Sequence, residues 1–235
     1  MKNKFSSISV IGLGHVGLTT AVTLAHKGFR VYGIDTNENI INQLQQSKTV
    51  IYEPNLQKLL IESIKNNLFI PTSTFKKPII ESELSFITVG TPNNIDGSIN
   101  LNNIFSVSEK LGKYIKNKTT PHLVVIKSTI IPGTTQNIVK IIEKHSNKKC
   151  GVDWNICVNP EFLREGSAIH DNLNPDKIVI GGYNKYTNTL LESFYNDVHS
   201  GNVPPIIKTT PSNAELIKYI NNVFLASKIS FINNI

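Results

Sequence analysis

A glycine-rich turn near the N-terminus has residue types and spacing that suit phosphate binding. A short β-branched run at 8–11 leads directly into Gly12, Leu13, Gly14, His15, Val16 and Gly17, and a helix-like pattern follows. The first glycine permits a tight bend, the second lets backbone approach a pyrophosphate, and the third allows close helix–strand packing. Unpaired N–H groups at the start of the helix then bind phosphate oxygens. The turn predicts a dinucleotide site, with a plain strand-to-helix turn as the alternative.

A carboxylate lies at the spacing that NAD binding requires. Asp35 ends a second predicted strand, about 20 residues beyond the glycines, where its oxygens can accept hydrogen bonds from ribose hydroxyls. A 2'-phosphate would be repelled there, and the next residues, Thr36 and Asn37, include no arginine to bind one. The sequence therefore favours NAD over NADP.

Four predicted strands end in sequences that suit a ligand site. Ligands of open parallel sheets bind beyond the carboxyl ends of the strands, so these segments should converge on one edge. Ordinary turn chemistry explains each segment taken alone, but their coincidence at one edge favours a site. Besides the glycine turn, the segments are Gly90, Thr91 and Pro92; Lys127, Ser128 and Thr129; and Asn159, Pro160, Glu161 and Phe162.

Glu161 is the carboxylate in these segments that best suits acid–base chemistry. The bulky residues Phe162 and Leu163 follow it and would partly remove it from water. Such desolvation favours the protonated form of a carboxyl group and suits it to proton transfer near neutral pH. A helix-capping role, or pairing with Arg164, is the alternative.

A final helix has a clear start and carries a lysine and an amide on one face. Thr210 can cap it, and Pro211 suits its first turn. Glu215 can complement the helix dipole near that end. Lys218 and Asn222 are four residues apart and so share a face. Together they could stabilise an oxyanion, although the residues alone favour a solvated surface.

Strands and helices alternate along the chain, which predicts an α/β, Rossmann-like, doubly wound sheet that is mostly parallel, with helices on both faces. Strands are expected at 7–11, 30–34, 68–70, 84–89, 122–127, 154–158, 177–181 and 205–208. Helices are expected at 15–27, 38–46, 56–65, 101–115, 134–145, 186–198 and from 211 onward.

Composition indicates a soluble globular protein, and its positive charge is compatible with a negatively charged nucleotide substrate. The 235 residues are 40% hydrophobic, enough for a substantial core. The net charge is +7, but the lysines are spread along the chain and no nucleic-acid-binding signature accompanies them, so no nucleic-acid partner is expected. No apolar run is long enough to span a bilayer, and no membrane partner is expected. Cys150 and Cys157 lack metal-site spacing, and Cys157 lies in an apolar run that predicts core packing, which favours a reducing cytoplasm.

Taken together, the motifs resemble the UDP-glucose 6-dehydrogenase family, within the nucleotide-sugar dehydrogenases that include GDP-mannose dehydrogenase. The resemblance runs along essentially the whole chain, and the segment 159–166 is its most specific part. Its carriers are the glycine turn 12–17, Tyr52-Glu53-Pro54, Val89-Gly90-Thr91-Pro92, Lys127-Ser128-Thr129, Pro132-Gly133-Thr134, Asn159-Pro160-Glu161-Phe162-Leu163-Arg164-Glu165-Gly166, Asn174-Pro175-Asp176 and the helix from Glu215 to Lys228.

The resemblance implies a two-step, four-electron oxidation of the C6 alcohol of UDP-glucose to UDP-glucuronate, with two NAD and a cysteine-bound thioester. By motif, Glu161 resembles the general acid/base and Thr129 a residue that positions water. Lys218 and Asn222 resemble the pair that stabilises an oxyanion at C6. Implied cofactor-binding residues are Gly12, Leu13, Gly14, His15, Val16, Gly17, Asp35, Gly90, Thr91, Pro92, Ser128, Thr129 and Glu165. Implied substrate-binding residues are Glu161, Phe162, Leu163, Arg164, Glu165, Lys218 and Asn222.

The chain departs from the family pattern in three places. Asn39, Ile40 and Ile41 stand where relatives commonly carry Lys or Arg, and Asn55 replaces a frequent glycine. The chain ends at Ile235, before the loop that carries the family's nucleophilic cysteine. We therefore expect an NAD-binding domain at 1–209 and the start of a connecting helix at 210–235, truncated before the rest of the enzyme.

Further expectations follow from that truncation and from the residues. This chain alone should bind NAD without completing catalysis, and the full-length enzyme should be a homodimer joined through the connecting helix. GDP-mannose is the second candidate substrate. A non-catalytic NAD-binding module and a basic interaction protein are the alternative functions.

Overall fold

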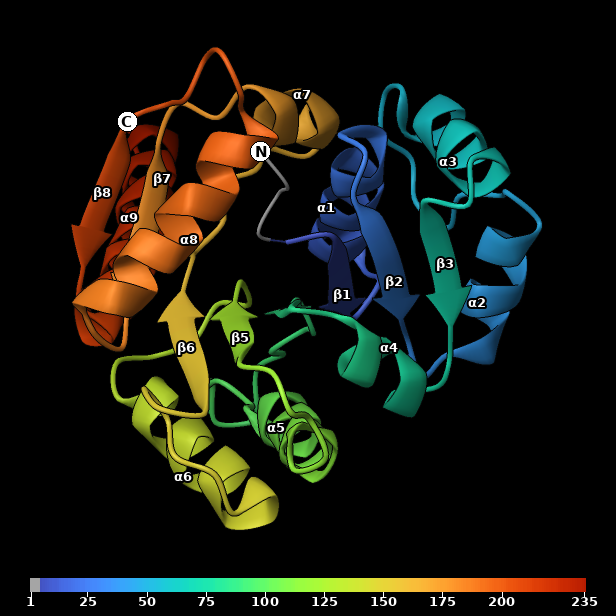
Figure 1. Cartoon of the computed structure of the whole chain (residues 1–235). Coiled ribbons are helices and arrows are strands. Elements are labelled where there is room, and N and C mark those ends of the chain that lie inside the picture. Colours follow the sequence, from blue (N-terminus) through green and yellow to red (C-terminus); the bar gives the residue numbers. More distant parts are fainter. Residues whose placement is uncertain (1–4) are drawn as a thin grey trace.

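A central sheet organises the computed structural model, which describes residues 5–235 (Figure 1). Within these residues the sheet is eight-stranded, with the order β3-β2-β1-β4-β5-β6-β7-β8. All neighbours pair in parallel except β6 and β7, where Cys157 lies opposite Gly182. The strands are β1 (Ser7–Ile11), β2 (Arg30–Ile34), β3 (Phe69–Thr72), β4 (Leu84–Ile87), β5 (His122–Ile126), β6 (Trp154–Val158), β7 (Ile178–Gly182) and β8 (Ile206–Thr209).

Helices cover both faces of the sheet, which confirms the expected doubly wound α/β architecture (Figure 1). On one face pack α1 (His15–His26), α2 (Glu38–Gln45), α3 (Leu56–Lys65), α7 (Ala168–Leu173) and α8 (Lys185–Val198). On the other pack α4 (Lys76–Glu81), α5 (Asn102–Ile115), α6 (Thr134–Ser146) and the first turns of α9 (Pro211–Asn233).

Alternate residues of the central strands enter two separate cores. In β5, Leu123 and Val125 join the core under α1 and α8, while Val124 and Ile126 join the core under α5 and α6. This follows from the twofold side-chain period of a strand. Because both faces are covered, every residue of β5 is buried, which explains why the central strands appear in the sequence as continuous apolar runs.

The helices α4 and α7 were not expected from the sequence. Each has six residues, too few for a 3.6-residue period to be distinguished from a loop. A buried lysine stabilises the end of α4, because the Lys118 ammonium donates to three main-chain carbonyls at 2.6–3.0 Å. Burial lowers the pKa of Lys118 to about 8. The three acceptors are the carbonyl oxygens of Ile79, Ile80 and Ser82.

The helix α9 begins where the sequence predicts and is anchored by its first two turns. The Thr210 side chain caps it, and Ala214, Glu215 and Lys218 are buried. Glu215 does not serve its own helix end as expected: its carboxylate accepts the N–H groups of Gly133 and Thr135 at 2.8 and 2.9 Å. It therefore caps the start of α6, where an anion is favoured by the unpaired N–H groups. Beyond Lys218 most of α9 is exposed.

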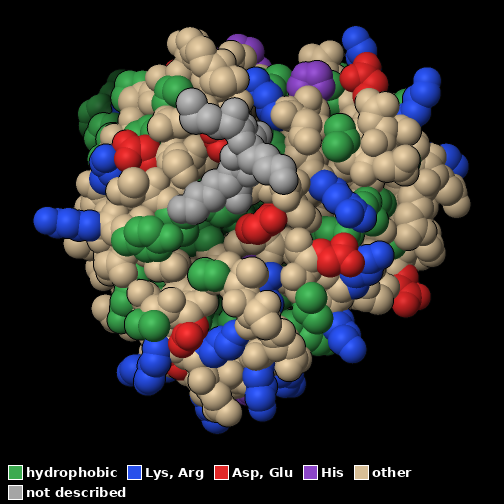
Figure 2. Space-filling model, in the orientation of Figure 1, with side chains coloured by type: hydrophobic (Ala, Val, Ile, Leu, Met, Phe, Trp, Pro, Cys, Tyr) green, Lys and Arg blue, Asp and Glu red, His purple; other side chains and the backbone are tan. Residues whose placement is uncertain are grey.

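Positive side chains occur over much of the face drawn in Figure 2 and are most frequent toward its bottom. Lysine and arginine side chains are dispersed there among acidic ones, with several toward the bottom of the view where α6 lies. Across residues 5–235, no helix combines the length and the apolar character needed to cross a membrane. The first four residues of the expected domain 1–209 lie outside the described part of the chain.

Candidate active site

The glycine turn between β1 and α1 has the conformation that its sequence predicts. Gly12 adopts a φ of +95°, a left-handed conformation that favours glycine, and its N–H donates to the carbonyl of Ile34 at 2.8 Å. At Gly17 there is no room for a side chain, since a Cβ would lie 1.7 Å from the Gly12 carbonyl oxygen. At Gly14 a Cβ would meet nothing within 4 Å. The turn is thus closed on its inner side and open where Gly14 faces a cavity.

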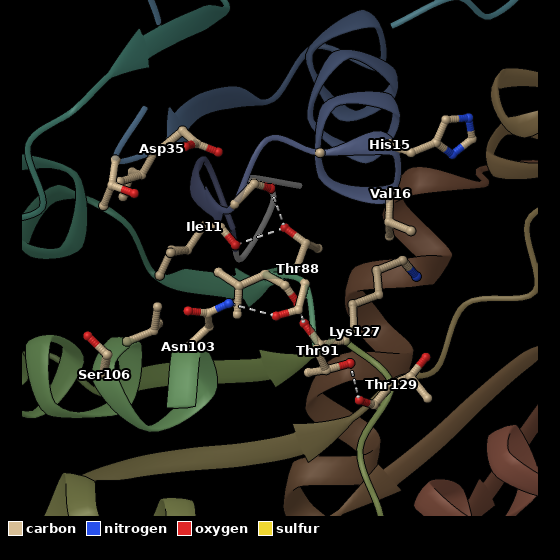
Figure 3. A pocket seen from close by; sticks show the side chains of 18 of the residues that line it. Ile11, His15, Val16, Asp35, Thr88, Thr91, Asn103, Ser106, Lys127 and Thr129 are labelled. Carbon is tan, nitrogen blue, oxygen red and sulfur yellow. Dashed lines mark hydrogen bonds between the residues drawn. The ribbon is translucent and has the colours of Figure 1, made fainter. Parts of the chain in front are cut away.

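That cavity has a volume of about 500 Å³ and lies beyond the carboxyl ends of β1, β2, β4, β5 and β6 (Figure 3). This is the edge at which the sequence predicts a ligand site. Site residues predicted from the sequence that line it are Gly12, Gly14, His15, Val16, Asp35, Gly90, Thr91, Ser128, Thr129 and Glu161. Further lining residues include Ile11, Ile34, Phe75, Thr88, Asn103, Ser106, Val107, Lys110 and Lys127.

Asp35 lies on one side of this cavity, and its carboxylate is held by the backbone. One oxygen accepts the Leu13 N–H at 2.7 Å and the other accepts the Asn37 N–H at 2.9 Å. A carboxylate oxygen has lone pairs for a second donor, so ribose hydroxyls can still bind there. The apolar side chains of Phe75 and Val107 also line this cavity. The open Gly14 backbone, the acid and the apolar wall together fit the phosphates, ribose and adenine of NAD.

The loops after β4 and β5 are hydrogen-bonded to each other, which fixes the floor of the cavity. The Thr91 hydroxyl donates to the Thr129 carbonyl at 3.0 Å, and the Ser128 hydroxyl donates to the Val89 carbonyl at 2.6 Å. Figure 3 shows Thr91 and Thr129 linked in this way, with Lys127 above them. Thr129 and Asp35 both line the cavity and lie on different sides of it in Figure 3.

In the same cavity, Glu161 is held between a lysine and a main-chain amide. The Lys218 ammonium donates to one Glu161 oxygen at 2.8 Å, and the Leu163 N–H donates to the other at 2.7 Å. The side chains of Lys218 and Glu161 are 8% and 14% exposed, so this ion pair is shielded from water. Its Coulomb energy is consequently larger than that of a surface pair. The buried position contradicts the solvated-surface interpretation of Lys218.

Lys127 is a second buried cation at the same point. Its ammonium donates to the Asn159 side-chain oxygen at 3.1 Å, and the Tyr195 hydroxyl donates to that same oxygen at 2.5 Å. Burial lowers the pKa of Lys127 to about 8; the nearby charge of Glu161 raises it and that of Lys218 lowers it further. A lysine with such a pKa can take up or release a proton near neutral pH.

A smaller cavity of about 210 Å³ adjoins the first, and Lys127 and Glu161 line both. Three other predicted substrate residues, Phe162, Leu163 and Arg164, line the smaller one. The Arg164 guanidinium forms an exposed ion pair with Asp171 at 2.7 Å. Glu161 is therefore the predicted residue that stands at the junction of the two cavities.

The remaining predicted site residues lie elsewhere. Leu13 and Gly17 are buried beneath the glycine turn and contribute through its backbone. Pro92, Glu165 and Asn222 are exposed and lie outside both cavities. Asn222 is one helical turn beyond Lys218 on α9, so the structure brings the lysine of this pair to Glu161 and leaves the amide toward solvent. Their assigned roles stay predictions.

Two residues of the site were not predicted as functional. Lys127 and Asn159 each belong to a segment that the sequence singled out, and each directly follows a strand. The signal that could have identified Lys127 is a lysine that directly follows the apolar run 123–126, because a lysine at the end of a buried strand is seldom left without a partner. Asn159 gave no local signal, since its partners lie on β5, β7 and α8.

Comparison with known proteins places these features in a family. Residues 6–199 match the UDP-glucose/GDP-mannose dehydrogenase family, NAD binding domain. The chain is 42% identical over 229 residues to GDP-mannose 6-dehydrogenase of Pseudomonas aeruginosa, covering 97% of this chain and 52% of that protein. It is 40% identical over 230 residues to UDP-glucose 6-dehydrogenase AglM of Haloferax volcanii, covering 97% and 53%.

A solved structure agrees with these matches. A ternary complex of GDP-mannose dehydrogenase from Pseudomonas aeruginosa superposes with a TM-score of 0.91 and 40% identity, over 96% of this chain and 51% of that one. The chain thus spans about half the length of the curated relatives it matches.

Proposed function

The chain belongs to the UDP-glucose/GDP-mannose dehydrogenase family, and we propose that it forms the part of a nucleotide-sugar 6-dehydrogenase that binds NAD and handles protons at C6. NAD is the cofactor of this family's N-terminal domain. The observation that carries the proposal is the position of Glu161: it lines both cavities, with Lys218 at 2.8 Å.

Bound at the glycine turn and Asp35, NAD would supply the acceptor for a hydride from the substrate carbon. The protein's own residues then manage charge on the substrate oxygen. We propose that the Lys218 ammonium stabilises negative charge there, because a cation in a water-poor site interacts more strongly than one in water. Glu161, fixed by the Leu163 N–H, takes up or returns the proton of a reacting hydroxyl or water. Thr129, which lines the same large cavity, is proposed to orient that water.

Lys127 is proposed to act as a proton reservoir for the same reaction. Its pKa of about 8 leaves a fraction of the side chain neutral at physiological pH. It lines both cavities, so a proton leaving the substrate end of the site can be held at Lys127 Nζ. Its bond to Asn159 keeps that nitrogen in place whichever form it takes.

For the substrate we propose UDP-glucose, with oxidation at C6 to UDP-glucuronate. The segment 159–166 supports this choice by its resemblance to the UDP-glucose enzymes. GDP-mannose is the second candidate, and the identity of 42% to a GDP-mannose 6-dehydrogenase specifically favours it.

The cysteines of this chain do not suit the role of a covalent nucleophile. Cys150 and Cys157 are both buried and unpaired. Burial raises the pKa of the Cys150 thiol to about 12 and raises that of Cys157 as well. A reactive cysteine needs the thiolate, which these sites disfavour. We therefore propose that residues 1–235 by themselves bind NAD and do not complete the four-electron oxidation.

We also propose that the NAD-binding domain comprises residues 1–209 and that α9 begins a connecting helix at 210. The exposed apolar side chains along α9 support a packed environment for this helix in a longer polypeptide or a homodimer. They include Leu216, Ile220, Val223, Phe224, Leu225, Ile229 and Phe231.

An activity assay tests the proposal. The natural polypeptide that carries these residues is incubated with NAD and either UDP-glucose or GDP-mannose, and NADH is followed by its absorbance. We expect turnover with one of the two, and a loss of about 100-fold or more in Glu161→Gln. If the wild type and Glu161→Gln bind NAD equally and neither turns over either sugar nucleotide, the result would instead favour a non-catalytic NAD-binding module.

A further inference from the structure

A buried carboxylate outside the two cavities connects the glycine turn 12–17 to the loop 161–168. Glu53 lies between α2 and α3 and is 4% exposed. One of its oxygens accepts a hydrogen bond from the His15 imidazole at 2.6 Å and another from the Gly166 N–H at 2.7 Å. The other oxygen accepts the Ala168 N–H at 3.1 Å. Three segments far apart in sequence thus meet at one side chain.

The chemistry of Glu53 suits a fixed junction. Burial alone would raise its pKa, but hydrogen bonds from the Gly166 N–H, from His15 and from the Ala168 N–H outweigh it and hold the pKa of Glu53 below its usual range. An ionised carboxylate only accepts, so His15 donates from Nε2. Each of the three bonds is therefore charge-assisted, which makes it stronger than a neutral hydrogen bond.

The two sides of this junction belong to different parts of the site. His15 is the first residue of α1 and lines the large cavity beside the open glycine. Gly166 and Ala168 close the loop that starts at Glu161. None of the residues 164–170 lines the large cavity, whereas Glu161 at the start of the loop does. A ligand in that cavity therefore reaches residues 164–170 through protein contacts, and the hydrogen bonds from His15 through Glu53 are one such route.

We propose that Glu53 is a positioning residue that couples occupancy of the NAD cavity to the order of the loop 161–168. This inference rests on the proposed function of that loop in holding the nucleotide sugar. When a bound dinucleotide fixes His15, the imidazole holds Glu53, and Glu53 holds the two amides. Such coupling is reciprocal, so ordering the loop also favours cofactor binding.

Amide hydrogen exchange with and without saturating NAD tests the proposal. In the wild type we expect NAD to slow exchange in peptides covering 12–17 and, by about fivefold or more, in peptides covering 164–170. In Glu53→Gln the response at 12–17 should remain, while the response at 164–170 should disappear. His15→Gln, which changes the partly exposed end of the junction, should give the same loss at 164–170.

Glu83→Gln is the matched control. Glu83 also accepts main-chain amides, from Ser6 and Ser7 at 3.2 and 2.8 Å, but it lies at the opposite end of the strands. This variant should keep both NAD responses. A purely structural latch would speed exchange at 164–170 in Glu53→Gln by the same factor with and without NAD.

The outcomes separate this inference from the proposed function. If NAD protects 12–17 in the wild type but 164–170 does not respond, or still responds in Glu53→Gln, the coupling is refuted and NAD binding stands. If NAD protects neither segment of the wild type, the proposed cofactor site itself fails.

Discussion

Adding one methyl group should have different effects at two glycines of the same turn: it should lower the stability of the fold at Gly17 and the affinity for NAD at Gly14. At Gly17, a Cβ would lie 1.7 Å from the Gly12 carbonyl oxygen and 2.7 Å from the Thr88 hydroxyl, where ordinary contacts begin at 3.4 Å. The start of α1 would have to move by more than an ångström. We expect Gly17→Ala to cost about 3 kcal/mol or more in free energy of unfolding, which lowers Tm by roughly 6–12 °C for a chain of this size.

At Gly14 the same change should leave the fold intact and weaken the binding of NAD. Gly14 has φ −69°, which any L-residue adopts, and a Cβ would meet nothing within 4 Å. Stability should stay within about 1 kcal/mol of the wild type. The methyl group would occupy the space where a pyrophosphate approaches the backbone. Losing one charge-assisted hydrogen bond predicts NAD affinity about 10-fold to 100-fold weaker.

Thermal unfolding by circular dichroism and NAD titration by calorimetry measure both effects on the same samples. The reasoning is refuted if Gly17→Ala unfolds at the wild-type temperature, or if Gly14→Ala binds NAD as tightly as the wild type. Loss of folding in Gly14→Ala would also refute the reasoning, because a Cβ at this position should meet no other atom within 4 Å.

Three further substitutions test the electrostatics. Asp35→Asn keeps an acceptor for the Leu13 N–H but removes the charge, so calorimetry should show the preference for NAD over NADP reduced about tenfold. Lys127→Met should be about 1–3 kcal/mol more stable than the wild type at pH 7, since the native pKa of Lys127, about 8, lies below the ordinary 10.5. Denaturant titration should show this advantage shrinking as the pH rises from 8 to 10.5. A constant advantage over that range would contradict the lowered pKa of Lys127. Lys118→Met should instead lose about 2 kcal/mol. The pKa of Lys118 is also lowered to about 8, but Lys118 is the donor to three main-chain carbonyls, whereas the one acceptor of Lys127 keeps the Tyr195 hydroxyl as a donor. A Tm equal to that of the wild type would contradict this prediction.

Local sequence signals were sufficient to predict the strands of the sheet and the residues of the glycine turn and Asp35 as one part of the site. The glycine turn and Asp35 each lie within one strand–turn–helix unit, so their spacing along the chain fixes their spacing in the fold. The strand ends after β4 and β5 converge because parallel strands end at one edge. The roles of these residues in binding stay predictions until a ligand is measured.

Contacts between residues far apart in the sequence could not be predicted from local patterns. The residues alone favoured a solvated surface for Lys218, and only the family resemblance assigned it to the site, because the local pattern of α9 does not reveal what covers its first turns. The contact with Glu161 spans 57 positions. Glu53 meets Gly166 across 113 positions, and Glu215 reaches Gly133 across 82. In each case a side chain satisfies buried amides or a buried cation that become neighbours only when the sheet is assembled.

The central claim is that the cavity beyond β1, β2, β4 and β5 binds NAD next to the Glu161–Lys218 pair. A titration of the ¹⁵N-labelled chain with NAD, followed by two-dimensional NMR, tests it most directly. We predict saturable shifts of the amides at 12–17, 88–91 and 127–129, with the amides of α6 unchanged. Absence of saturable shifts, or shifts confined to segments away from this edge of the sheet, would contradict the claim.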